Sequence, residues 1–192
     1  MNRPGGNVTG VTSLFGGLTA KQVGLLRDLV PAATLIGFLV NPRNPITERN
    51  VRDALDAAQK LGGKIEIVHA SSEAEIDAAF DTLRGIRASA LLVQPEAFLI
   101  NKRIVALAAR DALPAMYQTR ELVAAGGLMS YGSSGADMYR RMGVYASKVL
   151  KGATRPSCRC CSPSNSKWRL ICKRRRRSAS KSRTGCWRWP TR

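Results

Sequence analysis

Cysteine and tryptophan are absent from the first 150 residues of this 192-residue chain, and acidic residues are absent from the last 42. The first absence excludes disulfide bonds from the larger part of the chain. The second divides the formal net charge of +18 into +4 for residues 1–150 and +14 for residues 151–192. The whole-chain charge is therefore mainly a property of the last segment, and the two parts need separate interpretation.

The chain also has no apolar run close to the roughly 20 residues that a membrane-spanning helix needs. It opens with Met1–Gly6, which leads into polar and glycine residues without the apolar stretch of a secretory signal. We expect no direct insertion into a membrane. As it stands, the chain would stay cytoplasmic, although an exported protein without its first part would look the same.

Residues with catalytic or metal-binding chemistry are sparse. His69 is the single histidine, and the cysteines between Cys158 and Cys186 do not follow a zinc-binding spacing. No serine elbow or Walker A loop is present, and Gly5–Gly10 resembles a phosphate loop only loosely. We expect no metal, no cofactor and no enzymatic activity, with a doubly wound nucleotide-dependent enzyme as an open alternative.

What the first 150 residues do contain is an alternation of strand and helix patterns. The apolar run 34–40 is typical of a strand buried on both faces, and 64–70 alternates like a strand nearer the sheet edge. Further strands are predicted at 90–94, 113–118 and 128–132, and helices at 19–30, 51–61, 72–83, 104–112, 120–125 and 137–151. This order predicts an α/β fold with a mainly parallel sheet and helices on both faces.

Two helix starts have the spacing of a capping box, in which two side chains satisfy free backbone N–H groups reciprocally. They are Thr19 with Gln22 and Ser72 with Glu75. The helix over 51–61 is expected to turn one stripe toward the core. That stripe holds Val51, Ala54, Leu55, Ala58 and Leu61.

Polar and aromatic residues follow the predicted strands at the edge where ligands of open parallel sheets usually bind. They are Asn41, Gln94, Glu96, Tyr117, Gln118, Ser130 and Tyr131. Such groups suit a small polar molecule that is held without reacting. We predict ligand contacts from Asn41, Gln94, Tyr117 and Ser130.

The last segment, 153–192, is expected to be a basic tail of low order. Its run Lys173–Arg177 has no acid to offset it, and Trp168, Trp187 and Trp189 lie nearby. Basic and aromatic residues together are also typical of nucleic-acid binding, which gives an alternative function. Our main expectation is that this composition is accidental and that no nucleic acid is bound.

Several segments together resemble the ABC transporter substrate-binding protein family that includes the tryptophan/tyrosine-type uptake proteins. In chain order these segments are residues 3–12, 25–31, 37–42, 90–93, 113–117 and 124–132. The resemblance implies an exported bacterial protein with a type I periplasmic-binding fold, in which two α/β lobes close on a small polar solute. It also implies an ABC permease as the membrane partner and, as one class of solute, amino acids.

The resemblance covers about residues 2–152, which would form an incomplete second lobe. Family members normally begin with a signal peptide and a first lobe, and continue past the equivalent of Gly152 with a crossover, a strand and a closing helix. Here arginine, cysteine, serine and tryptophan follow instead, so we expect a frameshift near residues 152–156. The last helix would pack on the other lobe, leaving Met138, Met142, Tyr145 and Val149 partly exposed. A regulator whose effector domain shares this fold is a second alternative.

Overall fold

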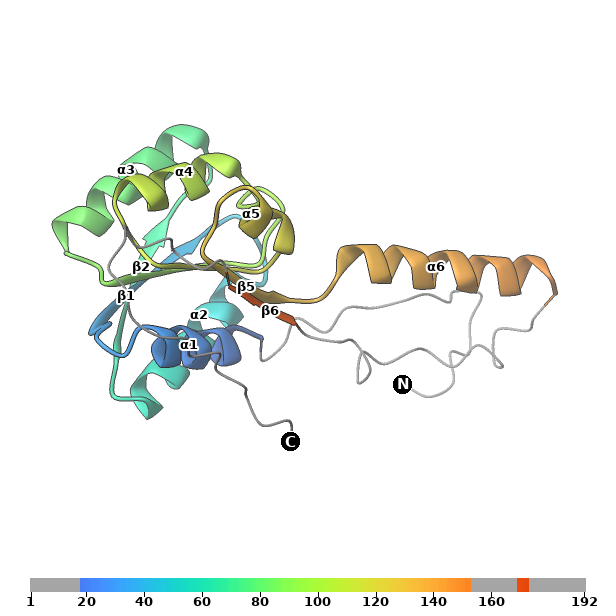
Figure 1. Cartoon of the computed structure of the whole chain (residues 1–192), viewed down its shortest axis with the longest axis horizontal. Coiled ribbons are helices and arrows are strands. Elements are labelled where there is room, and N and C mark those ends of the chain that lie inside the picture. Colours follow the sequence, from blue (N-terminus) through green and yellow to red (C-terminus); the bar gives the residue numbers. More distant parts are fainter. Residues whose placement is uncertain (1–17, 153–168, 173–192) are drawn as a thin grey trace, which may run out of the picture.

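The structure is a computed structural model that describes residues 18–152 and 169–172 of the chain. Six helices and six strands alternate through this part (Figure 1). The strands are β1 (Leu35–Val40), β2 (Lys64–His69), β3 (Ala90–Val93), β4 (Ala115–Tyr117), β5 (Met129–Gly132) and β6 (Arg169–Cys172). The helices are α1 (Leu18–Leu29), α2 (Thr47–Lys60), α3 (Glu73–Gly85), α4 (Lys102–Arg110), α5 (Arg120–Ala124) and α6 (Gly135–Leu150).

The six strands form one sheet in the order β2-β1-β3-β4-β5-β6. Every pair from β2 to β5 is parallel, and only the pair of β5 and β6 is antiparallel. β1 and β3 are continuous apolar runs in the middle of the sheet, whereas β2 at the edge alternates exposed and partly buried residues up to Ile67, after which Val68 is buried. The predicted mainly parallel α/β fold is confirmed.

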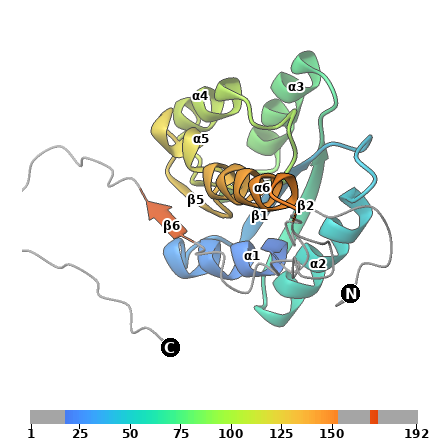
Figure 2. The same ribbon diagram turned by 90° about the vertical axis from the view of Figure 1, so that its right-hand side faces the viewer.

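Two helical layers cover the sheet, as the sequence predicts (Figures 1 and 2). α1 and α2 lie on one face, where Leu26 and Ala54 share a buried cluster with Phe38 of β1. α3, α4 and α5 lie on the other face, where Phe80 and Ile104 share a buried cluster with strand residues of the opposite pleat. Because successive strand residues point to opposite faces, the continuous apolar strands supply both clusters.

One of the two predicted capping boxes forms, with its second bond shifted by one residue. Ser72 Oγ accepts from the backbone N–H of Glu75 at 3.3 Å. The Glu75 carboxylate accepts from the backbone N–H of Ser71 at 2.8 Å, and this hydrogen bond lowers the pKa of Glu75. The sequence at the start of α3 therefore satisfies one free N–H group of its first turn, that of Glu75, and one just before the helix, that of Ser71.

The other predicted capping box is wrong. Gln22 Nε2 donates instead to the backbone carbonyl of Tyr131 in β5 at 2.8 Å, so the side chain links α1 to the sheet. The Thr19 hydroxyl is buried and has no hydrogen-bond partner. The Gln22 side-chain amide, which the local spacing places in the helix cap, binds the distant Tyr131 carbonyl instead.

The predicted core stripe of α2 is only partly correct. Ala54 and Ala58 are buried, but Leu55 and Leu61 are exposed. The buried face instead runs through Thr47, Asn50, Ala54 and Ala58. These small and polar side chains let α2 approach the sheet and α1 closely, which turns the larger leucines outward.

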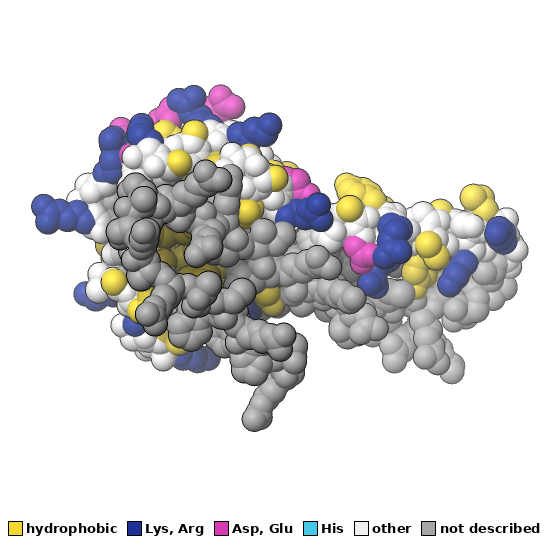
Figure 3. All heavy atoms as spheres, in the orientation of Figure 1, with side chains coloured by type: hydrophobic (Ala, Val, Ile, Leu, Met, Phe, Trp, Pro, Cys, Tyr) yellow, Lys and Arg dark blue, Asp and Glu magenta, His cyan; other side chains and the backbone are white. Residues whose placement is uncertain are grey.

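α6 extends away from the body of the molecule and has no buried residue (Figure 1). Figure 3 shows its hydrophobic side chains at the surface among lysine and arginine. Met142 is exposed, and Met138, Tyr145 and Val149 are half-buried, which confirms the predicted partial exposure. No helix among the described residues is long and apolar enough to cross a membrane.

Most of the segment predicted to have low order lies outside the described residues. Four of its residues, Arg169–Cys172, are described and form β6, which adds to the edge of the sheet beside β5 by backbone hydrogen bonding. The expected low order of the segment as a whole stays a prediction. The boundary at residue 152 stays a prediction.

Candidate ligand-binding edge of the sheet

The strand order creates a switch point between β1 and β3. These strands are neighbours, but the chain leaves β1 for α2 on one face of the sheet and leaves β3 for α4 on the other. The two connecting loops therefore diverge at the carboxyl edge. In open α/β sheets, ligands bind at such a point.

Two of the four predicted site residues meet there. Gln94, directly after β3, accepts through Oε1 from the backbone N–H of Asn41, directly after β1, at 2.7 Å. Gln94 Nε2 donates to Thr47 Oγ1 at 2.8 Å, and the Thr47 hydroxyl donates to the Asn41 carbonyl at 2.6 Å. Asn41, Thr47 and Gln94 thus form a closed, buried network that ties the two loops together.

The same network orders the start of α2. Asn41 Oδ1 accepts from the backbone N–H of Arg43 at 3.0 Å, and the Asn41 carbonyl also accepts from that of Asn44 at 3.1 Å. The asparagine side chain thereby substitutes for a backbone turn. Sequence reasoning found Asn41 and Gln94 but missed Thr47, because a threonine at a helix start suggests a local cap rather than a partner from another strand.

The other two predicted residues lie side by side on adjacent strands but beneath the surface. Tyr117 and Ser130 are register partners of β4 and β5, and they are 1% and 2% exposed. The Tyr117 side chain belongs to the core under α3, α4 and α5, and burial raises the pKa of its phenol. A Cβ on Gly127 would come within 2.7 Å of the Tyr117 ring, so this ring is held in place by the loop after α5.

Five buried side-chain atoms in the described residues have no hydrogen-bond partner. They are Thr19 Oγ1, Gln22 Oε1, Asn50 Nδ2, Glu96 Oε2 and Thr119 Oγ1. All five come from segments at the carboxyl edge: the first turns of α1 and α2, and the loops that leave β3 and β4. Since buried polar atoms are nearly always paired, their gathering at one edge distinguishes this edge within the described part of the chain.

Of these five residues, only Glu96 belongs to the wider set of strand-end residues in the sequence. The sequence did not suggest Thr19, Gln22, Asn50 and Thr119 as candidates, because each lies in the first turns of a helix or just before one. The signal that could have found them is the parallel topology itself. It brings the amino ends of the helices to the edge where the strands end.

Two exposed isoleucines flank the same loops. Ile46, just before α2, is 39% exposed, and Ile100, just before α4, is 46% exposed. The edge therefore combines unpaired polar atoms with apolar surface, which is the usual composition of a small-molecule site. Among the described residues, no group of three histidine, cysteine, aspartate or glutamate side chains could hold a metal ion.

The fold defines an α/β protein with an open, mainly parallel sheet covered by helices on both faces. The family model for ABC transporter substrate-binding proteins matches residues 1–169, and the chain belongs to this family. It is a non-enzymatic, substrate-binding class whose members are typically periplasmic or extracellular. The match extends past residue 152, so the change in composition there does not coincide with the end of the family match.

Solved structures agree with this family. An ABC domain from Streptococcus pneumonia in complex with L-Trp is 25% identical with a TM-score of 0.67, covering 83% of this chain and 55% of that one. A conserved domain protein from Vibrio cholerae is 19% identical with a TM-score of 0.72, covering 89% and 57%. This chain therefore spans just over half the length of these proteins. A comparison with curated proteins gives no match.

Transcriptional regulators share the fold as well. A LacI family regulator from Arthrobacter is 16% identical with a TM-score of 0.61, covering 88% of this chain and 66% of that one. At this identity the likeness concerns the fold alone. The basic segment on which the nucleic-acid alternative depends lies outside the described residues, except for Arg169–Cys172.

Proposed function

We propose that this chain forms one lobe of the solute-binding component of an ABC-type uptake system, and that the carboxyl edge of its sheet is its half of the solute site. A small polar solute would be held there against a second lobe. The observation that carries the proposal is the set of five buried polar atoms without partners, all at this edge. In a binding protein, water satisfies such atoms while the site is empty, and the ligand replaces those hydrogen bonds when it binds.

The four residues predicted from the sequence enter this proposal in two ways. Asn41 and Gln94 hold the β1–α2 and β3–α4 loops at a fixed separation, through the network with Thr47. Tyr117 and Ser130 form the floor of the site between β4 and β5. Preorganised loops above a rigid floor lower the entropy cost of binding a solute.

The proposal extends to partner and location. We propose that the intact protein works outside the cytoplasmic membrane and delivers its solute to a membrane permease, as the resemblance to tryptophan/tyrosine-type uptake proteins implies. An amino acid is the first solute class to test, because one similar solved structure contains L-Trp.

The test is solute binding by the full chain and by edge variants. Isothermal titration with L-tryptophan, followed by the other amino acids and simple sugars, identifies a solute. Thr119→Ala then removes one unpaired hydroxyl at the edge, and we expect binding to weaken about tenfold, since one lost hydrogen bond is worth about that factor.

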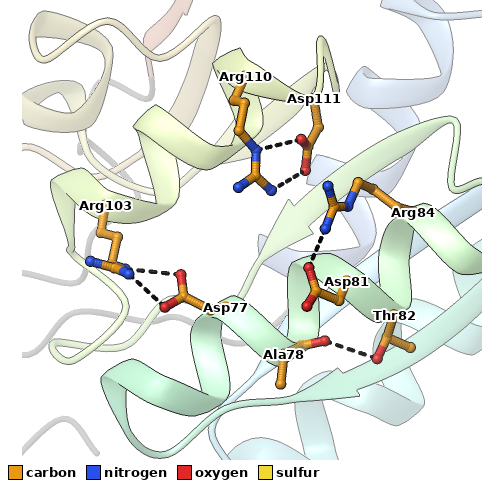
Figure 4. A network of polar contacts seen from close by, with 8 residues as sticks. All are labelled: Asp77, Ala78, Asp81, Thr82, Arg84, Arg103, Arg110 and Asp111. Atoms are coloured by element: carbon orange, nitrogen blue, oxygen red, sulfur yellow. Dashed lines mark hydrogen bonds and ion pairs between the residues drawn. The ribbon is translucent and has the colours of Figure 1, made fainter.

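Thr82→Ala is the matched control. Its hydroxyl lies on the exposed face of α3 and donates to the Ala78 carbonyl at 3.0 Å (Figure 4), so solute binding should not change. The proposal fails if no solute of the panel binds, or if Thr119→Ala and Thr82→Ala leave the affinity equally unaffected.

A further inference from the structure

We propose that two copies of this chain associate through the lateral edge of β2, so that their two sheets join into one. The lateral edge is the side of β2 that faces away from β1, with the backbone groups of Ile65, Ile67 and His69. The two β2 strands run antiparallel, with Lys64 of each copy opposite Glu66 of the other. This surface is separate from the proposed solute site, which lies at the carboxyl ends of the strands.

The hydrogen bonds of β2 show which of its backbone groups are free. β2 is the outermost strand, and its one neighbour in the described sheet is β1. The Lys64 N–H donates to the Thr34 carbonyl at 3.3 Å. The Ala70 N–H donates to the Val40 carbonyl at 2.9 Å. Because backbone groups along a strand point alternately to its two sides, the even-numbered residues bond to β1. The residues between them, whose N–H and carbonyl groups face away from β1, are Ile65, Ile67 and His69.

β2 is held in place on both of its faces. Ile65 and Ile67 are half-buried against the core cluster beneath α1 and α2. Val68 is buried in the cluster on the opposite face. A strand anchored in this way presents a row of free N–H and carbonyl groups in the extended form that another strand can pair with.

Two charged side chains accompany this free edge. Lys64 and Glu66 are both exposed, and because they are two residues apart they point to the same face of the sheet. Neither forms an ion pair with any residue of 18–152 or 169–172. By contrast, the aspartates Asp77 and Asp111 on the helical surface are paired with arginines (Figure 4). β2 therefore carries one unpaired charge of each sign.

This pair of charges is complementary to itself when the strand is reversed. A symmetric dimer uses the same surface on both copies, so β2 pairs with β2 as an antiparallel strand. With the two-fold axis at Ile65, the two Ile65 residues exchange both backbone hydrogen bonds. Lys64 of each copy is then directly opposite Glu66 of the other, in the type of pair whose side chains lie closest.

The charges also disfavour the neighbouring registers. A two-fold axis at Glu66 would place the two Glu66 carboxylates directly opposite each other, and like charges at such positions are destabilising. An axis at Ile67 would leave both Lys64 and Glu66 opposite uncharged residues. Only the axis at Ile65 joins charges of opposite sign, so one register is selected.

A second copy suits this edge better than an unrelated strand. Any strand could form the backbone hydrogen bonds. An unrelated strand would also need an acid opposite Lys64 and a base opposite Glu66, at the same spacing and in the reverse order. Symmetry provides both from β2 itself.

Sedimentation velocity of the full chain over a dilution series gives the first test. The samples are kept reduced, because the chain has five cysteines. We expect a reversible equilibrium of monomer and dimer. Lys64→Glu and Glu66→Lys each turn both attractive pairs into repulsive ones, and each should weaken the dimer about tenfold to a hundredfold. Lys102→Glu is the matched control, since it makes the same charge change at an exposed position of α4 and should leave the dimer intact.

A mixture of the two weakened variants gives the second test. Lys64→Glu carries acids at both positions, and Glu66→Lys carries bases at both. Every pair between the two proteins is therefore attractive, and the mixture should dimerise although neither variant does so alone at the same concentration. Circular dichroism of each variant checks that its fold is kept.

The possible results decide the proposal. A chain that stays monomeric throughout the dilution series would overturn it. So would a dimer that both β2 variants and Lys102→Glu affect equally, because another surface would then form the contact. Failure of the mixture to dimerise would show that Lys64 and Glu66 are not partners. None of these results bears on solute binding, which Thr119→Ala tests separately.

Discussion

At the scale of single residues, close backbone approaches decide which side chains the edge tolerates. At the end of β5, a Cβ added to Gly132 would lie 2.1 Å from the backbone carbonyl oxygen of Gln118, which follows β4. A backbone atom cannot move aside as a flexible side chain can. Glycine at this position therefore allows the backbone at the end of β5 to lie close to the backbone after β4, next to the proposed solute site.

We predict that Gly132→Ala destabilises the fold by about 1–3 kcal/mol, the cost of forcing extra volume into a packed region. Urea unfolding followed by circular dichroism measures this change. Gly143→Ala on α6 is the control, because a Cβ there meets no atom within 4 Å. It should change the free energy of unfolding by less than about 0.5 kcal/mol, as for surface positions. Equal effects of the two changes would contradict the close approach.

The residue scale also shows how far sequence reasoning about the carboxyl edge reaches, while the role of its residues in ligand binding stays a prediction. Asn41 and Gln94 were predictable as edge residues, since polar residues directly after buried strands lie where the strands end. Thr47, Asn50 and Thr119 were not, because helix starts favour threonine and asparagine for local reasons. Their role depends on which strand or loop stands opposite, and single-residue preferences do not contain that information.

At the scale of elements, α3 and α4 are joined by an ion pair on their outer surface. Arg103 of α4 donates to both carboxylate oxygens of Asp77 of α3 (Figure 4). The hydrogen bond from Arg103 lowers the pKa of Asp77 and raises that of Arg103. Since both groups are exposed, salt screens the attraction.

We predict a pH- and salt-dependent coupling between these two residues. Because the pKa of Asp77 is lowered in the folded state, the pair contributes its stability above the ordinary aspartate pKa of about 3.9. This contribution disappears as the pH falls through the lowered value. A double-mutant cycle of Asp77→Asn and Arg103→Gln should show favourable coupling at neutral pH and low salt. Coupling that persists in strong acid would contradict the pairing.

At the scale of the whole molecule, stability resides in the layered body and not in α6. Ile76 of α3 is 0% exposed within the core under α3, α4 and α5, whereas Met142 of α6 is 42% exposed. In the views of Figures 1 and 2, α6 projects from the body beyond the carboxyl edge. The two side chains therefore differ in what their removal costs.

We predict that Ile76→Ala lowers the free energy of unfolding by about 2–5 kcal/mol, the usual cost of a large-to-small change in a core. Met142→Ala should change it by less than about 0.5 kcal/mol, as for surface positions. Denaturant unfolding of both variants checks this. A large loss for Met142→Ala would show that α6 is covered in solution, by a second copy or by another part of the chain.

The sequence by itself determined the order of the elements and the class of the fold. Continuous apolar runs such as Leu35–Val40 require burial on both faces, and helical segments between them require parallel strands with crossovers. The family resemblance was also present in the sequence, because it depends on motifs in order and not on contacts. The polar strand ends indicated the edge at which we propose that a solute binds.

Only the tertiary structure decided which side chains meet at that edge and which remain unpaired. In the structure, Gln22 donates to the Tyr131 carbonyl and does not cap its own helix, and Gln94 donates to Thr47. Leu55 is exposed, and Glu96 Oε2 is buried without a donor. The physical reason is that hydrogen-bond partners and buried contacts often come from residues far apart in the sequence. The local pattern determines which segments form helices and strands. Which distant groups pair with one another is determined only when these elements pack.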